Sequence, residues 1–203
     1  MTDTSAAAFL RLVDGRRGHF RLESGYHSGR WLDLASLFAV PHAINPFVSA
    51  LTSALRPYAV EAVCGPLVGG AFLAQLIAQA LGVEFCFTER VMSSRVEGLY
   101  QARYRLPAGV ATRVREKRLA LVDDVMSAGS ALRATYAELE AQAAKPVVVG
   151  ALLVLGSPGA EFFAQRGVTV EAVSRDAYDL WRPADCPLCA AGLPLEDVAA
   201  PAV

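Results

Sequence analysis

The sequence predicts an α/β fold whose core is a doubly wound parallel sheet. From residue 58 onward, short apolar runs typical of buried strands alternate with longer segments of helical spacing. Two turns rich in glycine or serine follow strand ends directly, as in sheets that bind ligands at their carboxyl edge. The apolar run 147–155 is too short to span a bilayer and suits a central strand buried on both faces.

The 203 residues suffice for one domain with a full core and a small appended lobe. We expect a single domain over residues 1–203. Residues 1–40 form an N-terminal hood that includes a substrate segment, and residues 58–175 form the core. Residues 176–203 form a C-terminal extension that carries a CxxC motif.

The N-terminal part is predicted to hold two helices and a hairpin. Residues 6–14 have helical spacing behind a Thr/Ser pair that can cap a helix. Residues 18–38 alternate in polarity around a Ser-Gly-Tyr-His-Ser-Gly turn, which predicts a β-hairpin. Residues 46–56 form a helix that ends before Pro57.

The core elements follow in alternation. In chain order we expect strand 60–64, helix 70–81, strand 83–88, strand 117–123, helix 130–143, strand 146–155, helix 161–166 and strand 168–173. The turns 65–70 and 123–130 both follow strands, so they should line one crevice at the carboxyl edge. The connection from 88 to 118 carries Arg and Tyr without periodicity, and a connection of this length is usually functional.

Composition limits the partners. The chain is 54% hydrophobic and 19% charged, and its formal net charge of −1 argues against nucleic-acid binding. The N-terminus lacks the basic and apolar regions of a signal peptide, so we expect a cytoplasmic protein without membrane contact. The basic segment 113–118 is either a solvated strand entry or a contributor to the field around an anionic ligand.

The four cysteines fall into two pairs. Cys64 and Cys86 lie in apolar strand-like runs and are expected to be small core residues, since disulfides are rare in the cytosol. Cys186 and Cys189 form a single CxxC motif. A zinc site needs four ligands, and we expect no nearby histidine pair to supply the two that are missing. A packed extension is therefore favoured. A redox role or a metal site shared across a dimer remains the alternative.

The run 119–132 carries the most information about chemistry. A short apolar strand ends on Asp123 and Asp124, and the chain then turns through Ser127–Ser130 directly into a helix. A helix N-terminus offers unpaired N–H groups to a phosphate, glycine permits close approach, and adjacent acids can hold ribose hydroxyls or a hard cation. The alternative is an ordinary αβ turn with an Asp cap.

Three segments carry a resemblance to a known family. Residues 123–131, Asp-Asp-Val-Met-Ser-Ala-Gly-Ser-Ala, resemble the phosphoribosyl pyrophosphate loop of type I phosphoribosyltransferases, and the Ala-Gly-Ser-Ala ending resembles the orotate branch. Residues 18–33 resemble the substrate segment of orotate enzymes, and residues 64–74 resemble their pyrophosphate loop. The three matches occur in the family's order between residues 18 and 135.

The resemblance implies a reaction in which a ring nitrogen of a base displaces pyrophosphate from phosphoribosyl pyrophosphate through a transition state of oxocarbenium character. Orotate would give orotidine 5-phosphate, a step of pyrimidine biosynthesis. Asp123 and Asp124 would hold the ribose hydroxyls, directly or through Mg²⁺, and favour the developing cation. The phosphate site would comprise Ser127, Ala128, Gly129 and Ser130. The pyrophosphate site would comprise Pro66, Leu67, Val68, Gly69 and Gly70.

The resemblance also implies a mobile loop between residues 88 and 118 and a homodimer in which this loop reaches the neighbouring site. Departing pyrophosphate gathers charge, so an arginine should assist. Arg90 is the first choice for this catalytic role, and Arg103 and Arg105 are further candidates for pyrophosphate. The base is expected to contact Tyr26, His27, Ser28 and Arg30.

Three departures from the orotate pattern bear on the base. The loop has no lysine, which leaves Arg95, Arg103 and Arg105 as its cations, and His27 stands where lysine is common. Strand 151–157 ends without the Asp-Arg pair whose arginine reaches the orotate carboxylate. Tyr26, Arg30 and Trp31 could build a different base pocket, or the aromatic residues could be core.

These departures keep two alternatives open beside an orotate phosphoribosyltransferase. One is a transferase for a different base. The other is a non-catalytic regulator that binds phosphoribosyl pyrophosphate. A dinucleotide-dependent oxidoreductase is excluded, because no G-x-G-x-x-G opens the first helix of a βαβ unit.

Overall fold

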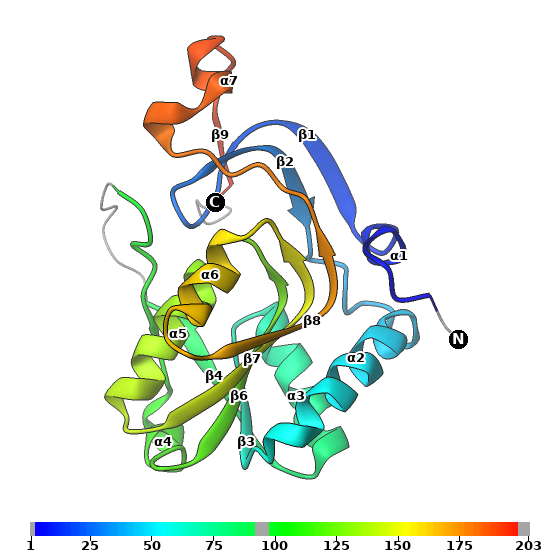
Figure 1. The fold of residues 1–203 in the computed structure, drawn as a ribbon, viewed down its shortest axis with the longest axis vertical. Helices are drawn as coiled ribbons and strands as arrows, with labels where there is room; N and C mark the ends of the chain where they lie inside the picture. Colours follow the sequence, from blue (N-terminus) through cyan, green and yellow to red (C-terminus); the bar gives the residue numbers. More distant parts are fainter. Residues whose placement is uncertain (1–2, 92–97, 199–203) are drawn as a thin grey trace.

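The computed structural model describes residues 3–91 and 98–198. Its centre is a six-stranded sheet of order β5-β4-β3-β6-β7-β8, in which every pairing is parallel except β4 with β5 (Figure 1). The strands are β3 (Ala62–Pro66), β4 (Glu84–Arg90), β5 (Tyr104–Arg105), β6 (Arg118–Met126), β7 (Lys145–Leu155) and β8 (Thr169–Asp176). The predicted doubly wound parallel sheet is confirmed.

Helices cover both faces of this sheet. α2 (Pro41–Leu55) and α3 (Gly69–Leu81) pack on one face, together with the short α1 (Ala6–Leu10). α5 (Ser130–Ala141) and α6 (Pro158–Ala164) pack on the other face, where they meet β6, β7 and β8. The order of the layers is therefore helix, sheet, helix.

The buried strands explain why the sheet sits at the centre. Along β6, Ala120 and Val122 face the α2 and α3 side, whereas Leu119 and Leu121 face the α5 side, and all four are fully buried. Side chains on a strand alternate between faces, so an unbroken apolar run buries both faces of a parallel sheet. Each buried leucine contributes about 2 kcal/mol to folding.

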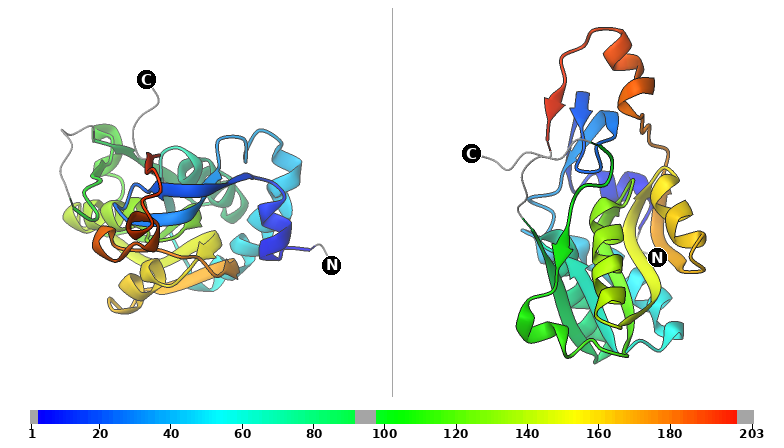
Figure 2. Two further views of the ribbon diagram at one scale, coloured as in Figure 1. Left: turned by 90° about the horizontal axis from the view of Figure 1, so that it is seen from above. Right: turned by 90° about the vertical axis from the view of Figure 1, so that its left-hand side faces the viewer.

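A three-stranded hood sheet lies beyond the carboxyl ends of the core strands. β1 (Asp14–Arg21) pairs antiparallel with β2 (His27–Asp33), and β9 (Glu196–Asp197) adds parallel to β1. Figures 1 and 2 show the C-terminal extension, with its four-residue helix α7 (Pro187–Ala190), rising above this hairpin. The first and last strands of the described chain thus share one small sheet.

The extension corrects one expectation about the cysteines. Two histidines of the hairpin, His19 and His27, lie beside Cys186 and Cys189, and the potential ligand atoms of all four lie within 4.8 Å of one another. The prediction that no histidine pair accompanies the CxxC was wrong, because spacing along the chain does not reveal contacts between segments this far apart. Cys64 and Cys86 are buried in the core, as predicted.

Several boundaries differ from the sequence prediction. α2 begins at Pro41 and continues through Pro46, whereas the prediction began it at residue 46. A proline in the second turn removes one helical hydrogen bond, and burial of Ile44, Phe47 and Leu51 against the core outweighs that cost. Among the described residues, no helix combines the length and apolarity needed to cross a bilayer.

The basic segment 113–118 is a structural feature. Arg113 Nη2 lies 3.2 Å from Glu84 Oε2, Lys117 also pairs with Glu84, and Arg118 Nη2 donates to the Tyr58 carbonyl at 2.8 Å. These contacts lie at the amino end of β6, opposite the carboxyl edge. The solvated strand entry is therefore the interpretation that the structure supports.

Candidate active site

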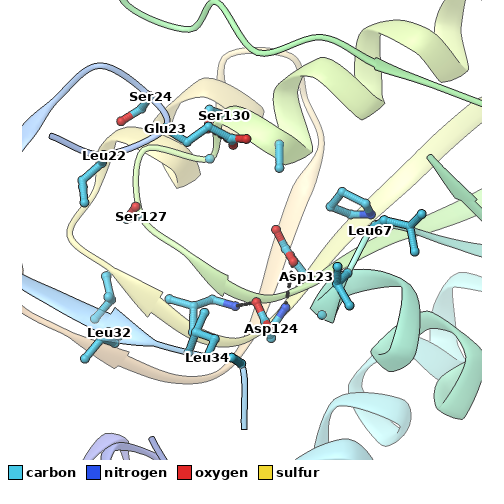
Figure 3. Close-up of a pocket in the computed structure, with 18 of the residues that line it drawn as sticks. Leu22, Glu23, Ser24, Leu32, Leu34, Leu67, Asp123, Asp124, Ser127 and Ser130 are labelled. Carbon is cyan, nitrogen blue, oxygen red and sulfur yellow. Dashed lines mark hydrogen bonds between the residues drawn. The ribbon is translucent and has the colours of Figure 1, made fainter. Parts of the chain in front are cut away.

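A cavity of about 420 Å³ lies between the carboxyl edge of the core sheet and the hood (Figure 3). Its floor comes from the ends of β3 and β6, and its roof comes from the loop between β1 and β2. The lining includes Glu23, Ser24, Trp31, Leu32, Pro66, Leu67, Val68, Gly69, Phe72, Tyr104, Asp123, Asp124, Ser127, Gly129, Ser130, Leu155 and Tyr178. The three sequence motifs thus meet at one place.

Asp123 and Asp124 form the acidic floor. The Asp124 N–H donates to Asp123 Oδ1 at 3.1 Å, and the Val125 N–H donates to Asp124 Oδ1 at 2.7 Å. Burial raises the pKa of Asp124 to about 6, and burial together with the charge of Asp124 raises the pKa of Asp123 well above its ordinary value. Hydroxyl donors or a hard cation at these oxygens would offset the cost of burying two adjacent charged carboxylates.

The turn after β3 packs directly on the acids. A Cβ on Gly69 would lie 1.9 Å from Asp124 Oδ2, and a Cβ on Gly70 would lie 2.8 Å from Asp123 Oδ1. Only glycine allows this approach, which brings the first turn of α3 against the carboxylates. Pro66, Leu67, Val68 and Gly69 line the cavity, whereas Gly70 is buried beside it.

The turn after β6 leads into α5 through Gly129, whose φ of +74° is a left-handed conformation that glycine adopts freely. Ser127, Gly129 and Ser130 line the cavity, and Ala128 is fully buried beneath the turn. α5 therefore begins at the cavity, with its unpaired backbone N–H groups at that end.

Glu23, in the loop between β1 and β2, connects the two sides of the cavity. Its Oε2 accepts a hydrogen bond from Ser130 Oγ at 2.7 Å. Its Oε1 accepts one from the Tyr104 hydroxyl at 3.0 Å and lies 3.3 Å from Arg90 Nε. Burial, and then the charge of Glu23, raise the pKa of Tyr104. Sequence reasoning selected neither Glu23 nor Tyr104, since a lone acid in a hairpin turn gives no local signal.

The residues expected to contact the base lie outside this cavity lining. His27 and Ser28 are buried within the hood, and Tyr26 packs edge-on against Tyr100 with ring centroids 5.8 Å apart. Arg30 pairs with Asp176 at 3.1 Å. Tyr26 precedes β2, and the residues of β2 that line the cavity are Trp31 and Leu32, toward its far end. Of the alternative base pocket, only Trp31 lies at the cavity.

The candidate arginines that the structure describes lie near the cavity but do not line it. Arg90 meets Glu23, and Arg103 and Arg105 line a neighbouring groove on the other side of Tyr104 and Ser130. Arg95 lies outside the described residues. Within the part of the chain that the structure describes, the cavity lining includes three acidic side chains and no basic one. A large part of the lining is apolar and includes Trp31 and Leu32 of β2, Phe72 of α3 and Leu155 of β7.

Comparisons with known proteins agree with this geometry. The family model "phosphoribosyl transferase domain" matches residues 51–174. Orotate phosphoribosyltransferase from Thermotoga petrophila is 33% identical over 179 residues, covering 88% of each chain. The enzyme of the same name from Wolinella succinogenes is 32% identical over 192 residues, covering 86% of each chain.

Two solved structures share the fold. Orotate phosphoribosyltransferase from Aeropyrum pernix has a TM-score of 0.62 at 20% identity, covering 82% of this chain and 89% of that one. Adenine phosphoribosyltransferase from Giardia lamblia, complexed with 9-deazaadenine, has a TM-score of 0.66 at 18% identity, covering 87% and 99%. The shared fold, the match over residues 51–174 and the convergence of the motifs on one cavity place this chain in the phosphoribosyltransferase family.

Proposed function

We propose that this phosphoribosyltransferase uses orotate as its acceptor and releases pyrophosphate and orotidine 5-phosphate. One observation carries the proposal: the Asp pair, the Ser127–Ser130 turn and the Pro66–Gly69 turn line the same cavity. Relatives named orotate phosphoribosyltransferase at about a third identity favour orotate among the possible acceptors.

The chain's own residues then have distinct roles. The Ser127–Ser130 turn and the start of α5 hold the 5-phosphate through hydroxyl and backbone N–H donors. Asp123 and Asp124 accept hydrogen bonds from the ribose hydroxyls, and their charge favours the cation that develops at the anomeric carbon. Backbone groups of Pro66–Gly69 orient pyrophosphate, and Arg90, released from Glu23, offsets its charge as it departs.

The donor set also fits Mg²⁺. Carboxylates whose pKa values are raised by burial and proximity gain from a divalent cation, and oxygen is the ligand that Mg²⁺ prefers. Asp123 and Asp124 would hold the ion, directly or through water. When bound, Mg²⁺ supplies charge neutralisation on the pyrophosphate. The proposal also includes a homodimer, which the family resemblance implies. A cytoplasmic location is a further part of it.

A transferase for a different base is the second candidate, and the apolar part of the cavity lining favours it. Orotate carries a carboxylate, whereas the described lining near Trp31, Phe72 and Leu155 offers no basic side chain. An uncharged base would bury its ring there without that partner. A regulator that binds phosphoribosyl pyrophosphate without turnover is the outcome to exclude.

The test is a calorimetric titration with phosphoribosyl pyrophosphate and Mg²⁺, followed by pyrophosphate-release assays with orotate, uracil and purine bases. We expect binding, and release with orotate. Release with another base alone would keep the mechanism and change the acceptor. Binding without release would identify the regulator, and no binding would refute the proposed site.

A further inference from the structure

Four potential metal ligands meet in the hood, away from the active-site cavity. His19 comes from β1, His27 from β2, and Cys186 and Cys189 from the C-terminal extension. Their ligand atoms all lie within 4.8 Å of one another. Neither the proposed reaction nor the cavity uses any of these side chains.

Four of the six distances between the ligand atoms are close to the edges of a tetrahedron around zinc. Bonds of about 2.0–2.1 Å to nitrogen and 2.3 Å to sulfur place neighbouring ligand atoms about 3.3–3.8 Å apart. His19 Nε2 lies 3.4 Å from Cys186 Sγ and 3.6 Å from Cys189 Sγ. His27 Nδ1 lies 3.3 Å from Cys189 Sγ and 3.1 Å from His19 Nε2. A small outward shift of the two nitrogens would complete the polyhedron.

The fold aims the two histidines at one point. The register of β1 against β2 shifts between Arg17 and Phe20, so His19 lies in a bulged part of β1. Arg21 pairs with His27, and residues two apart on a strand share a face, so His19 and His27 lie diagonally on the same face of the hairpin. Bulges commonly re-aim a side chain beside a functional site.

The protonation pattern suits metal binding. His19 Nδ1 lies 2.9 Å from the Leu193 carbonyl oxygen, and a proton donated there leaves the lone pair of Nε2 facing the cluster. A metal-ligating histidine typically makes this second contact. His19, His27 and Cys186 are each no more than 4% exposed, so the centre is shielded on three sides.

Between its two anchors on the hairpin, the bridge of Trp181 to His27 and the pairing of β9 with β1, the extension buries little. Between residues 182 and 196, Cys186 is the one buried residue, and Leu193 and Leu195 are more than two-fifths exposed. Its helical segments are three and four residues long, too short to be stable alone. In small units that lack a core, a structural metal often supplies the missing stability.

We propose that His19 Nε2, His27 Nδ1 and the sulfurs of Cys186 and Cys189 bind one structural Zn²⁺. Two thiols lose their protons on binding, and two thiolates with two neutral imidazoles leave the site uncharged. Tetrahedral S₂N₂ coordination is characteristic of zinc. The two histidines flank the loop that carries Glu23, so the ion fixes both ends of the segment that roofs the active site.

The first experiment measures metal content. The protein is expressed in zinc-supplemented medium and purified without chelator, and zinc per chain is determined by plasma mass spectrometry. We expect one equivalent. Cys189→Ala and His19→Ala should weaken zinc binding more than about 100-fold, since even residues outside the ligand set change affinity 10- to 100-fold. Wild-type protein without zinc would overturn the proposal.

Two matched controls come from the same chain. Cys86→Ala removes a buried thiol of the core, and His42→Ala removes the one histidine outside the cluster, which is exposed on α2. Both should retain a full equivalent of zinc. Loss of zinc from either control, or its retention by both ligand variants, would refute the assigned ligands.

A second measurement does not depend on the variants folding. Chelator-stripped wild-type protein is titrated with Co²⁺ under reducing conditions. We expect visible absorption of a tetrahedral ion with a thiolate charge-transfer band, saturating at one equivalent and abolished by Zn²⁺. A six-coordinate spectrum, or a Cys186–Cys189 disulfide in freshly purified protein, would overturn the proposal. Neither readout requires turnover, so both stand or fall independently of the proposed reaction.

Discussion

Ser130 Oγ donates a 2.7 Å hydrogen bond to Glu23 Oε2 and so connects the Ser127–Ser130 turn of the core to the hood. In this arrangement the Glu23 carboxylate accepts the hydrogen bond of the Ser130 hydroxyl, which the proposed function assigns to the 5-phosphate. The same carboxylate also neutralises the charge of Arg90. An anionic substrate that binds at Ser130 must displace Glu23, because its negative charge and that of the Glu23 carboxylate would repel each other at the same hydroxyl.

Glu23→Gln should therefore bind phosphoribosyl pyrophosphate several-fold more tightly than the wild type. Glutamine can accept a hydrogen bond from one of Ser130 and Tyr104 through Oε1 and donate one to the other hydroxyl through Nε2. It removes the repulsion, and about 1.4 kcal/mol corresponds to a tenfold change in Kd. Calorimetric titration in Mg²⁺ would measure it. Glu61→Gln, at the amino end of the sheet, is the control and should leave Kd unchanged. Weaker binding by Glu23→Gln would mean that Glu23 contributes to the site.

Asp124→Asn should reduce phosphoribosyl transfer at least about 100-fold, as expected when a charge aimed at the developing cation is removed. The substitution keeps the size of the side chain, so circular dichroism should show a folded protein. Pyrophosphate release with orotate is the readout. Turnover equal to that of the wild type would be incompatible with the role given to this carboxylate.

The same residue predicts an unusual pH dependence of stability in metal-free buffer. Burial raises the pKa of Asp124 from 3.8 to about 6 in the folded state, so the folded protein binds more protons than the unfolded chain between about pH 4 and pH 6. The contribution of Asp124 to the free energy of unfolding should fall as pH rises through this window, by up to about 3 kcal/mol, and then level off.

Urea denaturation with chelator from pH 4 to pH 8 would measure this fall. Asp124→Asn cannot titrate at this position, and it also relieves Asp123 of a neighbouring charge. The variant should therefore be more stable than the wild type at pH 7.5, with a smaller difference at pH 4. Parallel curves for the two proteins would show that the pKa of Asp124 is not raised in the folded state.

Gly69→Ala should disrupt the contact between the Pro66–Gly69 turn and the Asp pair. The new Cβ would lie 1.9 Å from Asp124 Oδ2, and overpacking of this kind costs about 1–3 kcal/mol. Thermal unfolding and pyrophosphate release should both decline. The control is Gly109→Ala on the short α4 (Ala108–Ala111), where a Cβ meets nothing within 4 Å. An unimpaired Gly69→Ala would show that the turn lies farther from the acids.

The core could be predicted from the sequence because its signals are local. The Asp123–Asp124 pair lies near the end of an apolar strand, the serine and glycine turns each follow such a strand, and parallel strands bring their carboxyl ends to one edge. Helix ends are harder to predict from the sequence. Pro46 lies inside α2, because packing of this helix overrides the low helix propensity of proline.

The hood contacts could not be predicted in this way. Whether Tyr26, His27 or Trp31 faces the cavity depends on the register of a bulged hairpin, and a shift of one residue exchanges the two faces. Glu23 and Ser130 lie on different elements, and so do His19 and Cys186. No local pattern records these pairings.

The parallel pairing of β9 with β1 also bears on the order of folding. The Arg16–Glu196 ion pair spans 180 positions, so the hood sheet has the highest loop-closure cost in the described chain, and the core strands between them pair over far shorter separations. During synthesis β9 leaves the ribosome after the entire core. The hairpin that roofs the cavity therefore gains its third strand only after every core strand has been made.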